Sequence, residues 1–214
     1  MKILVEAGID IFCKNKNKVN VLHLAVSRNH INIVEMLLDS DFPLDLETID
    51  GMTAFQLAAY NGHSEIIRII INYLKKHDNP EFTDLILNKV NPYSNLSTLA
   101  YAILNCGDGG AKGDQLFLGK KVSDKKNKPK DSKAADSAEA ENLKFAEYLD
   151  ISKQLIENGA QSYYSETDEQ KDFSPIFMAV QKEHQDLLEL MCDHGSSLTV
   201  KNSVGMTPLM FAAE

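Results

Sequence analysis

The stretch that decides the fold runs from Gly51 to Ile67 and reads GMTAFQLAAYNGHSEII. Its segment Phe55–Ala59 aligns with Leu22–Val26, which lies 33 residues earlier in the chain. The same offset of 33 residues separates Ser174–Val180 from Thr207–Ala213. A fixed period of this length is the signature of a repeat architecture, in which each unit buries its apolar face against its neighbours. The sequence therefore predicts an array of stacked repeats.

Each repeat carries the signals of two short helices. A hydroxyl side chain that can cap the first helix stands at Thr53, Ser174 and Thr207. Proline follows at the first helical position in two of these repeats, as Pro175 and Pro208. A second helix opens at Ser64, and its isoleucines between positions 66 and 71 leave so little polar surface that it must be buried. Glycines expected at left-handed C-caps follow the second helices, at Gly8, Gly159 and Gly195.

These residues resemble the ankyrin repeat, whose family pattern reads roughly D-x-x-G-x-T-P-L-H-L-A-A-x-x-G-H-x-E-I-V-x-L-L-L-x-x-G-A. Gly51–Ile67 and Gly205–Ala213 follow its first part, and Leu4–Asp10 and Leu155–Ala160 match its end. The resemblance implies an all-α ankyrin-repeat solenoid of helix–turn–helix repeats joined by hairpin-like loops. One repeat departs from the pattern, with Lys18 at the turn glycine and Asn20-Val21 in place of Thr-Pro. We expect the hairpin that enters this repeat to be irregular.

Residues 1–214 are predicted to form a single array. Its units are a partial repeat at 1–14, repeats at 15–47 and 48–80, an expanded repeat at 81–168, a repeat at 169–201 and a truncated repeat at 202–214. The expanded repeat would hold a short helix at 81–87, a first helix at 97–103 and a partner helix from about Asn142. A lysine-rich insertion at 107–141 interrupts it, and its composition favours a flexible, solvated segment. Neither end reads as a polar capping repeat, so we expect the chain to be part of a larger protein.

Charge and composition restrict the class of partner. The net charge is −9, and hydrophobic residues make up 43% of the chain, as in ordinary globular domains. We expect no nucleic-acid partner, because binding to phosphates requires clustered cations. No apolar run is long enough for insertion into a membrane. The scattered Cys13, Cys106 and Cys192 fit a reducing compartment. A cytoplasmic location is expected, with association with the cytoskeleton as a further option.

The candidate catalytic and metal-binding residues have a structural interpretation. His30, His63 and His184 occupy one repeat position, and the resemblance implies that this histidine forms structural hydrogen bonds near the start of the second helix. His23 matches the family histidine of the first helix. An active site is usually built from unlike residues brought together, whereas repetition at one position is typical of architecture. The cysteines lack the spacing of metal ligands. We therefore expect no catalytic residue, no metal, no cofactor and no enzymatic activity.

The resemblance implies recognition by a cupped surface, in which the hairpin tips act as fingers and the first helices as the palm. The positions that correspond in this chain are Lys16, Asn17, Val19, Ser27, Arg28, Ile49, Asp50, Met52, Tyr60, Asn61, Gln170, Lys171, Phe173, Gln181 and Lys182. One tip position is apolar in every repeat, as Val19, Met52, Leu96, Phe173 and Met206. This row would either supply interface anchors or pack against the adjacent hairpins.

We expect a non-catalytic scaffold or adaptor that binds another protein. The alternative is a regulatory or targeting segment of a larger enzyme or ion channel. The lysines between Lys112 and Lys133 offer a contact for an acidic partner, such as a tubulin tail, an anionic lipid surface or RNA. Acidic residues within the same insertion largely offset these lysines, so an ordinary solvated loop is the other interpretation.

Overall fold

The computed structural model describes residues 11–106, 134–163 and 174–213, and in the helix that begins at Ala134 it describes side chains from Phe145 onward. Within these ranges the chain is all helix and loop, apart from two isolated β-bridges, Glu47 with Thr53 and Val90 with Ser97. The all-α ankyrin-repeat fold predicted from the sequence is confirmed.

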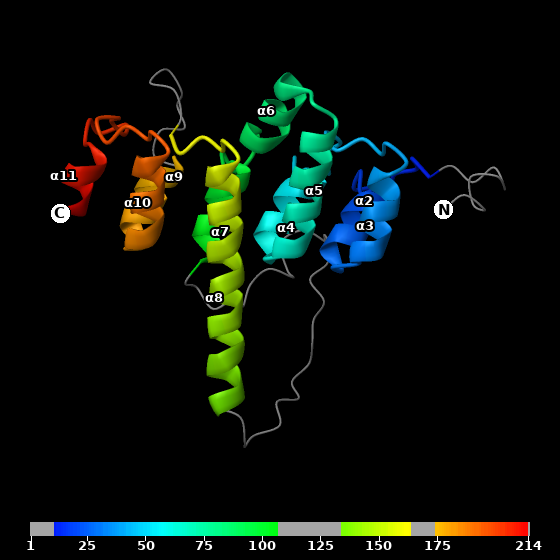
Figure 1. Cartoon of the computed structure of the whole chain (residues 1–214), viewed down its shortest axis with the longest axis horizontal. Coiled ribbons are helices and arrows are strands. Elements are labelled where there is room, and N and C mark those ends of the chain that lie inside the picture. Colours follow the sequence, from blue (N-terminus) through cyan, green and yellow to red (C-terminus); the bar gives the residue numbers. More distant parts are fainter. Residues whose placement is uncertain (1–10, 107–133, 164–173, 214) are drawn as a thin grey trace.

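The helices form two layers that run the length of the array (Figure 1). In the first-helix layer each helix packs against the next one named: α2 (Val21–Ser27), α4 (Ala54–Asn61), α7 (Thr98–Asn105), α9 (Pro175–Gln181) and α11 (Pro208–Ala212). The second-helix layer is built in the same way from α3 (Ile31–Leu38), α5 (Ser64–Lys76), α8 (Ala134–Glu157) and α10 (Gln185–Asp193). Where a repeat has two described helices, the first also contacts the second, so these units pack both within themselves and against their neighbours.

Tight hairpins join successive repeats. The amide of Asn15 donates to the carbonyl of Val19 at 3.0 Å, and Thr48 and Met52 form the same bond at 2.9 Å in the next repeat. The turn needs one residue with positive φ, which is Gly51 at 72° in the second hairpin and Lys18 at 57° in the first. The expectation of an irregular hairpin at Lys18 was therefore wrong, because this lysine adopts the left-handed conformation that the glycine would supply.

Side-chain caps fix where the first helices begin. Thr53 accepts from the amide of Gln56 at 3.2 Å, and Thr207 accepts from the amide of Met210 at 3.3 Å, as predicted. Asn20 stands in place of the expected threonine and caps α2 in the same way, accepting from the amide of His23 at 2.9 Å. Ser174 makes no side-chain capping bond, so that prediction was wrong, although Pro175 does occupy the first turn of α9.

Aliphatic side chains fill the space between the layers. On α5, Ile66, Ile67 and Ile70 have no exposed surface, as the apolar pattern of this helix predicted. Burying one such side chain contributes about 1.5–3 kcal/mol. In the first-helix layer, buried alanines stand where neighbouring helices contact each other, at Ala25, Ala58, Ala102 and Ala179.

The expanded third repeat keeps the two-layer plan. The short helix predicted at 81–87 is confirmed as α6 (Pro80–Asn88), which lies beyond the C-terminal end of α5 (Figure 1). Helix α8 takes the second-helix position, with Ile151 and Leu155 fully buried. It begins at Ala134, eight residues before the predicted start at Asn142, and its 24 residues span about 36 Å. Its N-terminal half therefore projects past the neighbouring helices (Figure 1).

Left-handed glycines follow two second helices, as predicted. Gly159 after α8 has φ of 92°, and Gly195 after α10 has φ of 83°. Gly8 lies outside the described residues, and so do the lysines of the insertion, Lys112 to Lys133.

Candidate protein-binding surface

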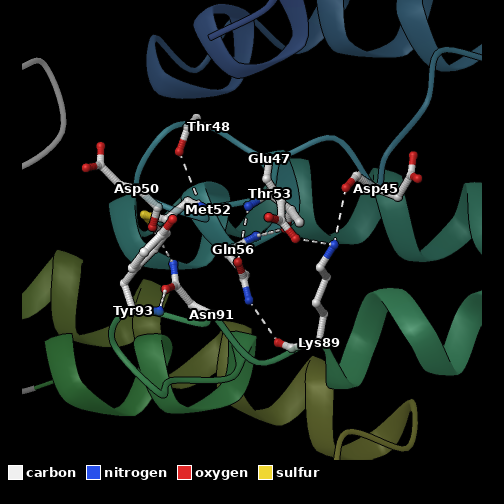
Figure 2. A network of polar contacts seen from close by, with 10 residues as sticks. All are labelled: Asp45, Glu47, Thr48, Asp50, Met52, Thr53, Gln56, Lys89, Asn91 and Tyr93. Carbon is white, nitrogen blue, oxygen red and sulfur yellow. Dashed lines mark hydrogen bonds and ion pairs between the residues drawn. The ribbon is translucent and has the colours of Figure 1, made fainter. Parts of the chain in front are cut away.

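Hydrogen bonds join the tips of three successive hairpins. The amide of Ile49 donates to the carbonyl of Asn17 at 2.9 Å, which connects the first tip to the second. The side-chain amide of Asn91 donates to the carbonyl of Asp50 at 3.0 Å, which connects the second tip to the third (Figure 2). We call residues 14–18, 48–51 and 91–95 the tip ridge. Because each bond joins adjacent tips, the ridge is held together as one surface.

Asn91 also shapes the third tip. Its side chain is buried, and its Oδ1 accepts from the amides of Tyr93 at 2.8 Å and Ser94 at 3.1 Å. These bonds turn the chain so that Tyr93 is 74% exposed. The Tyr93 ring lies over the backbone of Gly51, where a β-carbon would come within 2.9 Å of its Cδ2 atom. The exposed Tyr93 ring thus packs against the Gly51 backbone at the end of the tip ridge (Figure 2).

A polar network lies where the second hairpin meets the third repeat. Gln56 accepts from the amide of Thr53 at 3.1 Å and donates from Nε2 to the carbonyl of Lys89 at 2.8 Å (Figure 2). The ammonium group of Lys89 pairs with Glu47 at 2.6 Å and reaches the carbonyl of Asp45 at 3.3 Å. Gln56 is fully buried, so its pairing with both repeats fixes their relative position.

His23 occupies the position of Gln56 one repeat earlier. Its Nδ1 accepts from the amide of Asn20 at 3.4 Å, closing the same kind of capping box. Its Nε2 is buried without a hydrogen-bond partner, although the carbonyls of Met52 and Leu46 lie near the ring. Burial lowers the pKa of His23 to about 4, and these carbonyls oppose the shift. His23 is therefore neutral in the folded protein at physiological pH.

The first helices form the part of the candidate surface that adjoins the tip ridge. Tyr60 is half-buried, and its ring meets Tyr101 edge to face with centroids 5.9 Å apart. The carbonyl of Tyr60 accepts from the hydroxyl of Tyr148 at 2.9 Å and from Asn105 Nδ2 at 3.3 Å. Helix α8 thus holds the end of α4 across the insertion.

The structure places the predicted binding residues in four groups, of which one is buried and consists of Met52 and Leu96. The exposed side chains are Lys16, Ser27, Arg28, Ile49 and Gln181. Half-buried side chains are Asn17, Val19, Asp50, Tyr60, Asn61, Lys182 and Met206. Gln170, Lys171 and Phe173 lie outside the described residues.

Two members of the apolar tip row are buried rather than exposed. Met52 is completely buried and Leu96 is 8% exposed, and both belong to the hydrophobic core. At these two hairpins the residue that follows the turn packs between the repeats. For Met52 and Leu96, the packing interpretation is the one that the structure confirms.

Tyr93 is the exposed tip residue that the sequence prediction missed. The third hairpin closes from Asn91 to Leu96, one residue longer than the hairpins at 15–19 and 48–52. Helix α6 lies between the second and third hairpins and lengthens their spacing, so that Tyr93 follows Ile49 by 44 residues and a strict period of 33 does not align them. A proline-aromatic pair directly after a buried asparagine was the available signal, since Asn and Pro both favour turns.

Histidine and cysteine have structural surroundings in the described chain. His184 Nε2 lies 3.3 Å from the carbonyl of Cys106, and burial lowers the pKa of His63, opposed by the carbonyl of Ser27. His63 and His184 thus each precede a second helix and lie near the end of the preceding repeat's first helix. Burial raises the pKa of Cys106 to about 11, so it stays a neutral thiol.

Among the described residues, no three His, Cys, Asp or Glu side chains gather as a metal site. None of the described helices has the length and apolarity to span a membrane.

Comparison with known proteins agrees with this architecture. Residues 1–81 match the family described as ankyrin repeats (3 copies). Human 2-5A-dependent ribonuclease is 34% identical over 67 residues, which are 31% of this chain and 9% of the ribonuclease. The chain thus spans less than a tenth of that relative.

Solved structures extend the likeness along the chain. A crystal structure of an ankyrin repeat domain from Acinetobacter baumannii matches 92% of this chain and 74% of its own, with a TM-score of 0.61 and 21% identity. Another ankyrin repeat protein matches 99% of this chain and 82% of its own, with a TM-score of 0.63 and 18% identity. A third match, with a TM-score of 0.55 and 16% identity, covers 99% of this chain and 82% of a chain from the complex of a Bdellovibrio bacteriovorus predatory endopeptidase with its immunity protein. Residues 1–81 therefore carry the ankyrin-repeat family pattern, and the described residues share the fold of solved ankyrin repeat domains.

Proposed function

We propose that this chain is a non-catalytic scaffold or adaptor that binds another protein through the tip ridge and the adjoining first helices. Exposed side chains on a rigid, hydrogen-bonded ridge are the observation that carries the proposal. Ile49 is 50% exposed and Tyr93 is 74% exposed, and both are held by neighbouring tips. Pre-organised side chains lose little conformational entropy on binding, which favours recognition.

The titratable groups of the described residues favour binding over catalysis. His23 closes the capping box of α2, His184 Nε2 lies near a main-chain carbonyl, and Cys106 is held as a thiol. An active site needs a nucleophile or base that faces an accessible cavity in a matched protonation state. We propose that the chain acts in the cytoplasm, where free cysteines stay reduced.

Site-specific photo-crosslinking tests the proposed surface. A photoreactive phenylalanine analogue is placed at Ile49 or Asn61 on the proposed face, and at Arg68 or Leu85 on helices α5 and α6 as controls. Each variant is used to capture proteins from cells, and the crosslinked products are identified by mass spectrometry. We expect one partner to crosslink from positions 49 and 61 and not from 68 or 85. Crosslinks confined to the control positions would contradict the proposed face.

Deleting residues 107–141 separates the surface from the insertion. A partner that is retained after the deletion binds the ridge and the first helices. Loss of the main partner while the fold persists by circular dichroism would assign recognition to the insertion, including its Lys112 to Lys133 segment.

One observation favours a second candidate, a regulatory or targeting segment of a larger enzyme. The relative that is 34% identical is named as a ribonuclease, and the matched part is 9% of it. An enzyme domain encoded in the same reading frame as this chain would support this role. A complete reading frame that contains only repeats would contradict it.

A further inference from the structure

The exposed groups of the tip ridge differ in character from one end to the other. At the first tip Lys14, Lys16 and Lys18 are all exposed. Ile49 is exposed at the second tip, and Tyr93 is exposed at the third. The only acidic residue within the ridge is Asp50, which is half-buried. The ridge therefore presents positive charge first, then an aliphatic side chain and then an aromatic ring.

The three lysines are available to a partner. No ion pair joins any of them to another residue in the described part of the chain. Lys89 differs from these three lysines because it forms an ion pair with Glu47 of another repeat. The chain as a whole carries a net charge of −9, so a cluster of three cations that have no ion pair among the described residues departs from the general charge of the molecule. Long-range attraction at this tip would select a negatively charged ligand.

We infer that the tip ridge binds an extended acidic peptide segment that carries an apolar or aromatic side chain beyond its carboxylates. This inference rests on the proposed protein-binding function and names the chemistry of the partner. The carboxylates would pair with Lys14, Lys16 and Lys18, and the apolar side chain would pack between Ile49 and Tyr93. Tyrosine provides a large contact area at low entropic cost, and it accepts both apolar and polar neighbours.

The geometry sets the length of the segment. Packed helices lie about 8–10 Å apart, so the first and third tips are separated by roughly 20 Å. An extended chain advances about 3.3 Å per residue, so the segment needs about six residues between its first carboxylate and its anchor. The hydrogen bonds at Ile49 and Asn91 fix this spacing, and a flexible ridge would not impose it.

The inference is tested with synthetic peptides and the full chain. The probe is the fluorescein-labelled peptide Glu-Glu-Glu-Glu-Gly-Ser-Leu-Tyr, together with its reversed order, because the partner can run in either direction. A counterpart with Gln for every Glu tests charge, and single-stranded oligouridylate of equal negative charge tests a nucleic-acid ligand. Binding is measured by fluorescence anisotropy at about 50 mM and about 300 mM salt, where screening differs strongly.

Two pairs of variants locate the contact. K14E/K16E reverses two charges on the ridge and leaves Lys18 in its turn, and K75E/K76E makes the same change of charge at the exposed end of α5. We expect K14E/K16E to weaken peptide binding at least about tenfold and K75E/K76E to change it less than about twofold. I49A and Y93A should each weaken binding about fivefold or more at both salt concentrations, because apolar contact is not screened.

Equal binding of the Gln peptide, equal effects of the two charge-reversal pairs, or tighter binding of oligouridylate would overturn the inference. These outcomes differ from failure of the proposed function. A protein that crosslinks from positions 49 and 61 would still establish protein binding if every acidic peptide failed. If no protein is crosslinked and no acidic peptide binds, both the proposed function and the inference about acidic peptides are contradicted.

Discussion

His23 and Gln56 stand 33 residues apart and perform the same task in successive first helices. Each side chain accepts a hydrogen bond from the backbone of its own N-cap residue, Asn20 or Thr53. The two side chains differ in the hydrogen bonding of their Nε2 atoms. Gln56 donates to the carbonyl of Lys89 in the following repeat, whereas His23 Nε2 has no bonded acceptor. At this repeat position, Gln56 therefore joins the second repeat to the third by a hydrogen bond, whereas His23 places a titratable ring between the first repeat and the second.

The first prediction concerns the pH dependence of stability. The pKa of His23 is about 4 when folded and 6.5 when unfolded, so between these values the unfolded chain binds a proton that the folded chain does not. The contribution of neutral His23 is complete above pH 6.5 and is lost as the pH falls toward 4. The shift corresponds to roughly 3 kcal/mol. The lowered pKa of His63 acts in the same direction.

Urea unfolding at a series of pH values between about 4 and 7.5 measures this effect. His23→Gln should flatten the profile, because glutamine keeps the capping box and does not titrate. His194→Gln alters an exposed histidine at the end of α10 and serves as the control. An unchanged slope in the His23 variant would show that other groups cause the acid sensitivity.

The signals that could be predicted from the sequence are local ones. The capping of α4 by Thr53, the left-handed Gly159 and the burial of Ile66 depend on the residue and its immediate neighbours, and all three were predicted. The hairpin at Lys18 was misjudged because the hydrogen bonds of the turn can hold a lysine in the conformation that glycine prefers. The early start of α8 was missed because the alanine- and glutamate-rich run after Ala134 was grouped with the lysine-rich insertion, although those residues favour helix.

The candidate surface was harder to predict. A period states where a residue lies within a repeat, but not whether the next repeat covers it. Met52 and Ile49 share one hairpin, yet Met52 is buried and Ile49 is 50% exposed. The exposure of Tyr93 depends on Asn91, whose side chain bonds to a tip 41 residues earlier in the sequence. Contacts of this kind are fixed by tertiary packing.

A second prediction concerns the bond between Gln56 and Lys89. Gln56→Leu leaves the carbonyl of Lys89 and the amide of Thr53 without their partner in a buried position. We expect a loss of about 1–3 kcal/mol in the free energy of unfolding, measured with urea at pH 7.5. Gln56→His should lose less, because His23 shows that a histidine can close the capping box at this position. Its stability should fall more steeply than that of the wild type as the pH is lowered. Equal losses for the two variants would contradict this role of the side-chain amide.

A third prediction separates backbone strain from packing at the tip ridge. Gly51→Ala and Gly205→Ala both place a β-carbon at positive φ, at 72° and 86°. Only the alanine at position 51 would also meet Tyr93 Cδ2 at 2.9 Å and Pro92 Cδ at 3.0 Å, since nothing lies within 4 Å at position 205. Each change should cost about 1–2 kcal/mol for the left-handed conformation. Gly51→Ala should cost about 1 kcal/mol more in urea unfolding, because packed atoms must shift. Equal costs would show that the Tyr93 ring moves away freely.

The last prediction concerns the contact that closes the expanded repeat. The ring of Tyr148 lies against Gly62, where an added β-carbon would be 3.1 Å from Cζ, and its hydroxyl donates to the carbonyl of Tyr60. Tyr148→Phe removes only the hydroxyl, and Asn105 still donates to that carbonyl. The loss should therefore be about 0.5–1.5 kcal/mol.

Tyr148→Ala also removes a buried ring and should cost about 3–5 kcal/mol. Hydrogen exchange followed by mass spectrometry should then show faster exchange in the part of α8 from Phe145 to Glu157 and in α4, while α2 and α3 keep their protection, because α8 packs on α5 and α7 rather than on the first repeat. Uniform loss of protection along the array would mean that the repeats unfold as one unit, and that Tyr148 has no local role in holding α8 against α4.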